Sequence, residues 1–233
     1  MKNYVIIGGS SGIGRSVVEK LTAKGHRVWA TFFSKDMTHH ETPNVSYHYM
    51  DVTQEELDFS WLPNEVNGFV YAPGAIDLLP FGRMKMEKLN GDFQLQVMGA
   101  VKSLQLVMPK MKRAENPSIV LYSTVAVQMG FNFHSQVAIS KGAIEGLTRS
   151  LAAEFAPKVR INAIAPSITK TPLAEKFLSS EAKVEANAQR HPLKRIGEAS
   201  DIANATLFLL SEESHWMTGQ IINVDGGMSR IKL

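Results

Sequence analysis

Apolar and polar residues alternate along the chain in blocks that predict a strand, a turn and a helix, several times over. The first strand is the apolar run YVIIG at residues 4–8, which ends in a glycine cluster. The segment 14–25 that follows has Val17, Val18 and Leu21 on one helical face and stops at Gly25. Further strands are predicted at residues 26–33, 45–50 and 67–73.

The alternation continues through the second half of the chain. Apolar residues three or four apart predict a helix from just after Gly82 to about Lys112, and helices are also predicted at 134–155 and 200–210. Strands are predicted at 118–123, 159–166 and 220–227. Strands joined by helical crossovers lie parallel, so the pattern predicts an α/β, Rossmann-type, doubly wound sheet with helices on both faces.

Length and composition favour a single domain spanning residues 1–233. The chain is 44% hydrophobic, which is enough for one substantial core, and it contains no internal repeat or low-complexity linker. The segment 167–195 differs from the rest because it is polar, rich in Ala, Glu and Lys, and follows a strand end. We expect it to form a lid over a substrate, although a surface helical insertion fits its composition equally well.

Charge and cysteine content exclude several functions. The net charge of +3 comes from 25 basic and 22 acidic residues without a long run of either sign, so no nucleic-acid surface is predicted. No cysteine is present, which excludes disulfides and thiolate chemistry. The first residues resemble neither a signal peptide nor a membrane span, and we expect a cytoplasmic protein. The adjacent His39 and His40 lack a spaced carboxylate partner, so no metal site is predicted.

The glycine-rich segment GGSSGIG at residues 8–14 carries the strongest chemical signal. It lies between a predicted strand and a predicted helix, where glycines allow a tight turn and backbone N–H groups can approach a pyrophosphate. An ordinary tight turn is the alternative interpretation. The residues predicted to bind the cofactor phosphates in this segment are Gly8, Ser10, Ser11, Gly12, Ile13 and Gly14.

The spacing of Gly8, Gly12 and Gly14 resembles the short-chain dehydrogenase/reductase family, whose pattern is Thr-Gly-x-x-x-Gly-x-Gly, with Ile7 here in place of the threonine. The resemblance extends along most of the chain. It includes DVT at 51–53, YAPG at 71–74 where the family has Asn-Asn-Ala-Gly, SKGAIEGLTRSLAAEFAP at 140–157, VRINAIAPSITKTPL at 159–173 and GQIINVDGG at 219–227.

The end of the second strand favours NADP(H) over NAD(H). An acidic residue there would bind the adenosine ribose and repel a 2′-phosphate, but the strand ends in Phe32. Lys35 follows, and Ser34 and Ser11 offer hydroxyls to a phosphate. A solvated Lys35 with no role in binding is the alternative interpretation.

The resemblance also implies contacts along the rest of the cofactor. Asp51 would contact the adenine with Val52 packed beside it, and Gly74 would border the adenosine ribose. Lys141 would hold the nicotinamide ribose. The segment that begins at Pro166 resembles the family's carboxamide-binding turn, in which Ile168 would offer backbone groups and Thr171 a hydroxyl.

The catalytic residues implied by the family are only partly present. A tyrosine in the family donates a proton, a lysine four residues later lowers its pKa, a serine orients the carbonyl, and an asparagine holds a water. Lys141 is retained, but Val137 stands four residues before it. Thr124 stands at the serine position and Gln96 at the asparagine position, and both keep the type of chemistry.

His134 is the candidate substitute for the missing proton donor. Seven residues of a regular helix turn through about 700°, so His134 would project within about 20° of Lys141. The enoyl reductase branch of the superfamily places its tyrosine at this spacing, and histidine can donate a proton near neutral pH. The alternative is a helix-start residue without a role. Tyr122 is a further candidate, or else a buried aromatic.

These observations predict an NADPH-dependent reductase acting on a small carbonyl or enoyl compound. A non-catalytic NADP(H)-binding subunit, such as a redox sensor or a partner of an active homologue, is the alternative because of Val137. The resemblance implies a homodimer or homotetramer. The small and apolar residues at 138–155 suit a helix that buries two faces, which can also occur within one subunit.

Overall fold

The computed structural model describes residues 1–232, in which seven parallel strands form one central sheet. The strand order is β3-β2-β1-β4-β5-β6-β9. This order confirms the predicted doubly wound sheet, and each predicted strand is present. The strands are β1 Asn3–Ile7, β2 Arg27–Phe32, β3 Val45–Tyr49, β4 Gly68–Tyr71, β5 Ser118–Tyr122, β6 Arg160–Pro166 and β9 Ile221–Val224.

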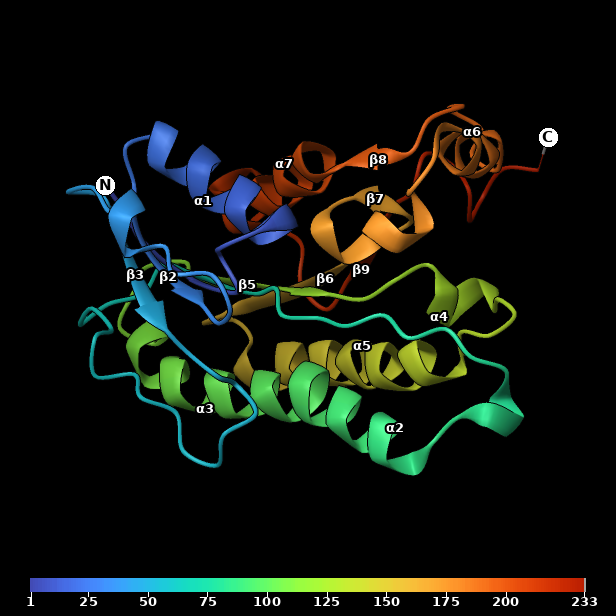
Figure 1. Ribbon diagram of the computed structural model, residues 1–233. Helices are drawn as coiled ribbons and strands as arrows, with labels where there is room; N and C mark the ends of the chain where they lie inside the picture. The colour runs from blue at the N-terminus through green and yellow to red at the C-terminus, as the bar shows by residue number, and fades with distance from the viewer. Residues whose placement is uncertain (233) are drawn as a thin grey trace.

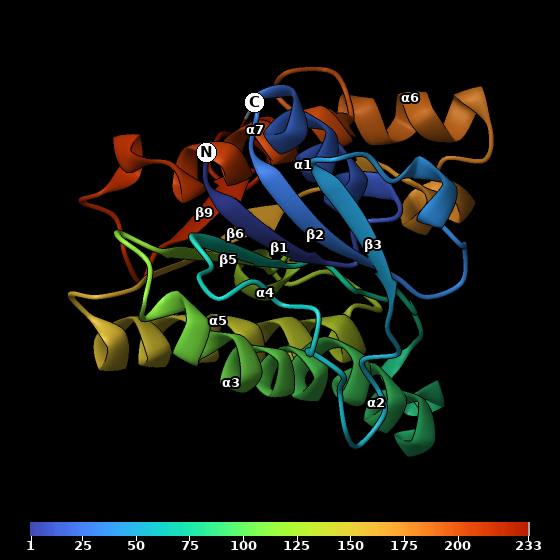
Figure 2. The same cartoon turned by 90° about the vertical axis from the view of Figure 1, so that its left-hand side faces the viewer.

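Helices cover both faces of the sheet (Figures 1 and 2). The helices α1, Gly12–Ala23, and α7, Ala199–Leu210, pack together on one face, and α3, Gly99–Met111, and α5, Ser135–Phe155, lie on the other. Because both faces are covered, β4 and β5 are buried along their whole length, as their continuous apolar sequences require. The chain leaves β1 and β4 toward opposite faces, which opens a crevice at their carboxyl ends.

The helix predicted to begin just after Gly82 is divided in the structure. It starts only at Met86, after the short turn η2, Phe81–Arg83. Helix α2, Met86–Phe93, passes into a π-helical turn η3, Gln94–Met98, which continues as α3. The Tyr71 hydroxyl donates a hydrogen bond to the carbonyl oxygen of Leu95, so the side chain gives this carbonyl of the widened turn a hydrogen-bond partner.

The segment predicted as a lid folds into several short elements after β6. These are β7 Thr169–Lys170, η4 Pro172–Phe177 and α6 Glu181–Gln189, and β7 pairs in parallel with β8, Gly197–Glu198. Figure 1 shows β7 and β8 on the same side of the sheet as α7, whereas α4, Ala126–Met129, lies on the side of α5. The segment therefore faces the start of α5 across the carboxyl ends of the strands.

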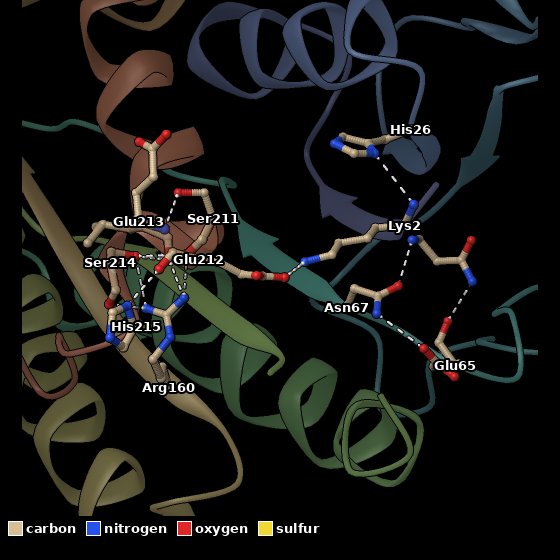
Figure 3. Close-up of polar contacts among 12 residues, drawn as sticks. Lys2, His26, Glu65, Asn67, Arg160, Ser211, Glu212, Glu213, Ser214 and His215 are labelled. Carbon is tan, nitrogen blue, oxygen red and sulfur yellow. Dashed lines mark hydrogen bonds and ion pairs between the residues drawn. The ribbon is translucent and has the colours of Figure 1, made fainter. Parts of the chain in front are cut away.

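A half-buried arginine ties the end of α7 to the sheet (Figure 3). The guanidinium of Arg160, on β6, donates to the carbonyl oxygens of Leu209, Ser211 and Ser214 at 2.9–3.0 Å. These carbonyls belong to the last turn of α7 and to the residues that follow it through turn η5, Glu212–Ser214. Carbonyl groups at a helix end have no N–H donor within the helix.

The helices found in residues 1–232 do not combine the length and apolar character that a bilayer crossing requires.

Candidate functional site

A pocket of about 940 Å³ lies at the carboxyl ends of the central strands. Its wall combines the glycine-rich turn, the ends of β2, β4, β5 and β6, the start of α5 and the segment 167–195. All residues predicted to bind cofactor or to act in catalysis line it except Lys35. They are Gly8, Ser10, Ser11, Gly12, Ile13, Gly14, Ser34, Asp51, Val52, Gly74, Gln96, Thr124, His134, Lys141, Pro166, Ile168 and Thr171.

The glycine-rich turn has the geometry of an anion cradle. Gly8 and Gly12 adopt φ values of +79° and +52°, which side chains other than glycine rarely reach. A Cβ on Gly14 would overlap the carbonyl group of Gly8. Helix α1 begins here without a side-chain cap and without an acidic residue in its first turn, so its first N–H groups are available to a negatively charged group. These features fit the pyrophosphate of a dinucleotide.

The side chain of Thr31 supports the turn and was not predicted from the sequence. Its hydroxyl oxygen accepts a hydrogen bond of 2.9 Å from the Gly8 N–H. Thr31 lies on β2 and reaches Gly8 only because β1 and β2 are neighbours in the sheet.

The opposite end of the pocket, beyond β2 and β3, is lined by Phe33, Ser34 and Asp51. The Asp51 carboxylate accepts hydrogen bonds from Gln54 and Thr53, and these bonds hold its pKa below the ordinary value. Its orientation toward the pocket is therefore fixed by its own chain segment.

Lys35 lies outside the lining but on the same edge of the molecule. The pKa of exposed His40 is lowered, first by partial desolvation and then by the positive charges of His39, Arg15 and Lys35. Arg15 follows the glycine-rich turn directly in the sequence. The Arg15 guanidinium is paired with the Glu19 carboxylate at 2.8 Å, so the positive charge beside the end of β2 comes mainly from Lys35.

Thr124, Val137 and Lys141 lie at one end of the pocket, which we call the catalytic end because the residues predicted to act in catalysis lie there. The Thr124 hydroxyl accepts a long hydrogen bond of 3.3 Å from the Ala126 N–H and lies 3.5 Å from the Pro166 oxygen, so it remains available to a ligand. Val137 is 6% exposed. Lys141 keeps some surface toward the pocket, yet protein encloses its ammonium group, and desolvation lowers its pKa to about 8 against the opposing charge of Asp92.

The helix carrying Lys141 begins one residue later than predicted. His134 has φ −98° and ψ 9° and precedes α5, so the angular argument for a regular helix does not fix its ring. Its Nδ1 lies 2.8 Å from the Asn132 carbonyl oxygen, and its ring contacts that of Phe131 at 5.3 Å between centroids. His134 lines the pocket beside Phe131.

Tyr122 is engaged in the protein core. Its hydroxyl hydrogen bonds to the Thr206 hydroxyl of α7 at 2.8 Å, and burial raises its pKa. Of its two predicted roles, the structure favours the buried aromatic.

A buried carboxylate, Asp92, lies beneath the catalytic end and was missed in the sequence. It accepts a hydrogen bond of 2.7 Å from the Gln96 amide nitrogen and another from the Ser140 hydroxyl. The four-residue spacing of Asp92 and Gln96 is the only signal the sequence offered, and such polar pairs usually lie on solvated helix faces. Three cations of the segment 167–195, Lys176, Lys183 and Arg190, also line the pocket and were not singled out from the sequence.

No cluster of three or more His, Asp or Glu side chains suited to a metal ion occurs in residues 1–232. The rings of His39 and His40 contact each other at a tilt of 41° in the exposed turn η1, Thr38–His40.

Comparison with known proteins identifies the family. A family model described as Enoyl-(Acyl carrier protein) reductase matches residues 8–229, which include all the residues that line the pocket except Ile7. The chain belongs to the short-chain dehydrogenase/reductase family. Bovine L-xylulose reductase is 31% identical over 97% of this chain and 96% of its own length. The 3-oxoacyl-(acyl-carrier-protein) reductase FabG of Thermotoga maritima is 32% identical over 97% of both chains.

Solved structures of other family members have the same fold as this short-chain dehydrogenase/reductase. The ligand-free aldohexose dehydrogenase of Thermoplasma acidophilum superposes with a TM-score of 0.90 at 29% identity, over 100% of this chain and 96% of the other. ElxO with NADP bound superposes with a TM-score of 0.87 at 26% identity, over 98% and 99%. The L-xylulose reductase, FabG and the aldohexose dehydrogenase are oxidoreductases by name, and ElxO was solved with NADP bound, which supports a general oxidoreductase activity and a nicotinamide cofactor.

Proposed function

We propose that this short-chain dehydrogenase/reductase is an NADPH-dependent reductase of a small carbonyl or enoyl compound. The observation that carries the proposal is a single pocket that joins an uncapped helix N-terminus to an available Thr124 hydroxyl and to Lys141. The names of the bovine and Thermotoga relatives, both reductases, support reduction as the physiological direction.

The residues of this chain would share the work as follows. NADPH supplies a hydride when bound. The turn from Gly8 to Gly14 would hold its pyrophosphate, and Lys141 the nicotinamide ribose. The Thr124 hydroxyl would donate a hydrogen bond to the substrate oxygen and so orient it. The segment 167–195 would act as a lid that excludes water from the pocket.

The proposed function is tested by measuring single-turnover loss of NADPH absorbance with a panel of ketones and enoyl thioesters. We expect oxidation well above the rate without substrate for at least one member of the panel. Calorimetry must first demonstrate NADPH binding. Tight binding combined with no oxidation by any panel member would contradict the proposal.

Val137 occupies, in our proposal, the place of the family's proton-donating tyrosine. We expect Val137→Tyr to raise ketone reduction by at least about tenfold, since a positioned general acid contributes on the order of 10²–10⁴ in rate. Val137→Phe is the matched control, because it adds the same ring without a hydroxyl. Equal rates in the two variants would refute the assignment of this position.

The preference for NADP(H) would arise from the positive charge of Lys35 after β2, since Arg15 nearby is paired with Glu19. We expect Lys35→Glu to weaken NADPH binding about tenfold at low salt and to leave NADH binding nearly unchanged, because only NADPH carries the 2′-phosphate. Lys24→Glu, an exposed change at the other end of α1, controls for net charge. Isothermal calorimetry with both dinucleotides measures the difference, and an equal loss for both would argue against the preference.

A non-catalytic NADP(H)-binding subunit is the second candidate. Val137 favours it, and so does Tyr71, whose hydroxyl is committed to the Leu95 carbonyl. A redox sensor or a partner of an active homologue would bind NADPH without oxidising it. We propose that the enzyme forms a homodimer or a homotetramer. Co-purification of a different protein from native extract would instead support the non-catalytic subunit.

A further inference from the structure

The floor of the catalytic end is a buried polar cluster made by three helical segments. Asp92 at the end of α2 is 6% exposed, Gln96 in the π-helical turn is 1% exposed, and Ser140 on α5 is fully buried. Burying a carboxylate is costly unless it is hydrogen-bonded and paired with a charge. Both Asp92 oxygens are hydrogen-bonded, and the cation that acts on it through space is Lys141.

The Gln96 amide has only one orientation in this cluster. Its nitrogen donates to Asp92 at 2.7 Å and to the Ala75 carbonyl at 3.3 Å, so its oxygen must point the other way. That Oε1 atom is buried and has no hydrogen-bond partner in the described part of the chain. A buried acceptor without a partner is rare and points to a ligand or a water that donates to it.

Gln96 Oε1 and Lys141 Nζ flank the same small volume. They lie 3.5 Å and 3.9 Å from the point where a Cβ on Gly74 would stand. Gly74 thus leaves room at the pocket wall for a water that donates to the amide oxygen and accepts from the ammonium group.

We infer that Lys141 is itself the proton donor of this site, and that Asp92 is a positioning residue that keeps Lys141 charged and Gln96 oriented. The inference rests on the proposed reductase function. It assigns to Lys141 the role that a tyrosine would have and that Val137 cannot perform.

The proton and electron balance of the step is complete with the proposed cofactor class. Bound reduced nicotinamide would supply a hydride, that is two electrons and a proton, for the substrate carbon, whose π bond to oxygen would break. The substrate oxygen takes a proton from the Lys141 ammonium, which becomes a neutral amine. A water hydrogen-bonded to Gln96 Oε1 would pass a proton to the amine and take a proton from bulk solvent in turn, which restores the ammonium group.

The other ionisable groups around Lys141 lie on its own helix, on α2 and η3, and in the pocket wall. On its own helix, Glu145 accepts from the Ser123 hydroxyl at 2.8 Å and lies 3.6 Å from Arg149, so it is already partnered. Asp92 is the only group on α2 and η3 found to act on the charge of Lys141. The remaining ionisable groups of the pocket wall are Asp51, Tyr122, His134, Lys176, Lys183, Arg190 and His191.

The positioning role of Asp92 is tested without any turnover. In protein labelled with ¹³C at the lysine Cε, NMR should follow Lys141 titrating near pH 8. Asp92→Asn removes the negative charge that favours the ammonium form, so the midpoint should move to lower pH. Glu145→Gln, which removes another buried carboxylate nearby, should leave it in place. Unchanged titration in Asp92→Asn, with thermal melting showing a folded protein, would overturn the positioning role.

The donor role is tested by the pH profile of single-turnover reduction. The wild-type rate should fall as pH rises through about 8, since the ammonium form is lost, and the fall should begin at lower pH in Asp92→Asn. Lys141→Arg keeps a cation for the ribose but cannot give up its proton, so it should reduce substrate about 100-fold more slowly and without this fall. Two results would overturn the donor role. One is a wild-type rate that does not change with pH, and the other is a Lys141→Arg variant that shows the same fall in rate as the wild type. If the wild type oxidises no NADPH, the proposed function and the donor role both fail, while the NMR titration still decides the role of Asp92.

Discussion

Replacing Gly14 by valine is expected to abolish NADP(H) binding, with a loss of at least about 100-fold in affinity, or about 2.7 kcal/mol. A Cβ at this position would overlap the Gly8 carbonyl group and come within 3.3 Å of the Ala72 side chain. The Gly8 backbone cannot move aside freely, because its N–H donates to Thr31 and its own φ is +79°. The turn must therefore open, and the N–H groups that converge on the pyrophosphate would separate.

Isothermal calorimetry with NADPH measures this loss. Gly146→Ala is the matched control: Gly146 lies in the middle of α5 and a Cβ there meets nothing within 4 Å. The control should bind NADPH normally and gain about 0.5–1 kcal/mol of stability from helix propensity. Wild-type affinity in Gly14→Val would exclude the glycine-rich turn as the phosphate site.

Replacing Arg160 by leucine is expected to lower the free energy of unfolding by about 3 kcal/mol. The guanidinium donates to Leu209, Ser211 and Ser214, and Figure 3 shows it beneath the turn that these residues form. Leucine fills the aliphatic space but leaves carbonyl oxygens at the end of α7 without a donor. Because α7 packs on α1, whose first turn lines the pocket, the loss should reach the cofactor site.

Denaturant unfolding measures the loss, and the midpoint should fall while the slope stays constant. Arg113→Leu is the control, since Arg113 makes a single exposed contact of 3.4 Å to the Asn64 oxygen. It should change stability by no more than about 0.5 kcal/mol. A similar effect of both substitutions would show that the helix-end contacts of Arg160 contribute little.

The sequence predicted the fold because each strand and crossover helix carries a local pattern. Buried strands such as β4 and β5 are continuous apolar runs, and α1 places Val17, Val18 and Leu21 on its sheet-facing side. The glycine-rich turn was recognisable for the same reason, since its function depends on backbone positions that are consecutive in the chain.

Contacts between distant segments could not be predicted in this way. The π-helical turn depends on Tyr71, which lies 24 residues before Leu95, and Ser140 reaches Asp92 across 48 residues. The predicted angle between His134 and Lys141 assumed a regular helix, but the helix begins only after His134, so that angle does not fix the direction of the His134 ring. Hydrophobic periodicity specifies which face of an element is buried, but it does not specify which polar groups meet there.

The sequence by itself therefore determined the order of strands and helices, the glycine-rich turn and the four-residue spacing of Val137 and Lys141. Only the tertiary structure decided that the buried Asp92 acts on the charge of Lys141, that Gln96 has a single orientation, and that cations of the segment 167–195 line the pocket. The physical reason is that the charge of a lysine depends on its burial and on nearby charges, and these are set by packing between helices far apart in the chain.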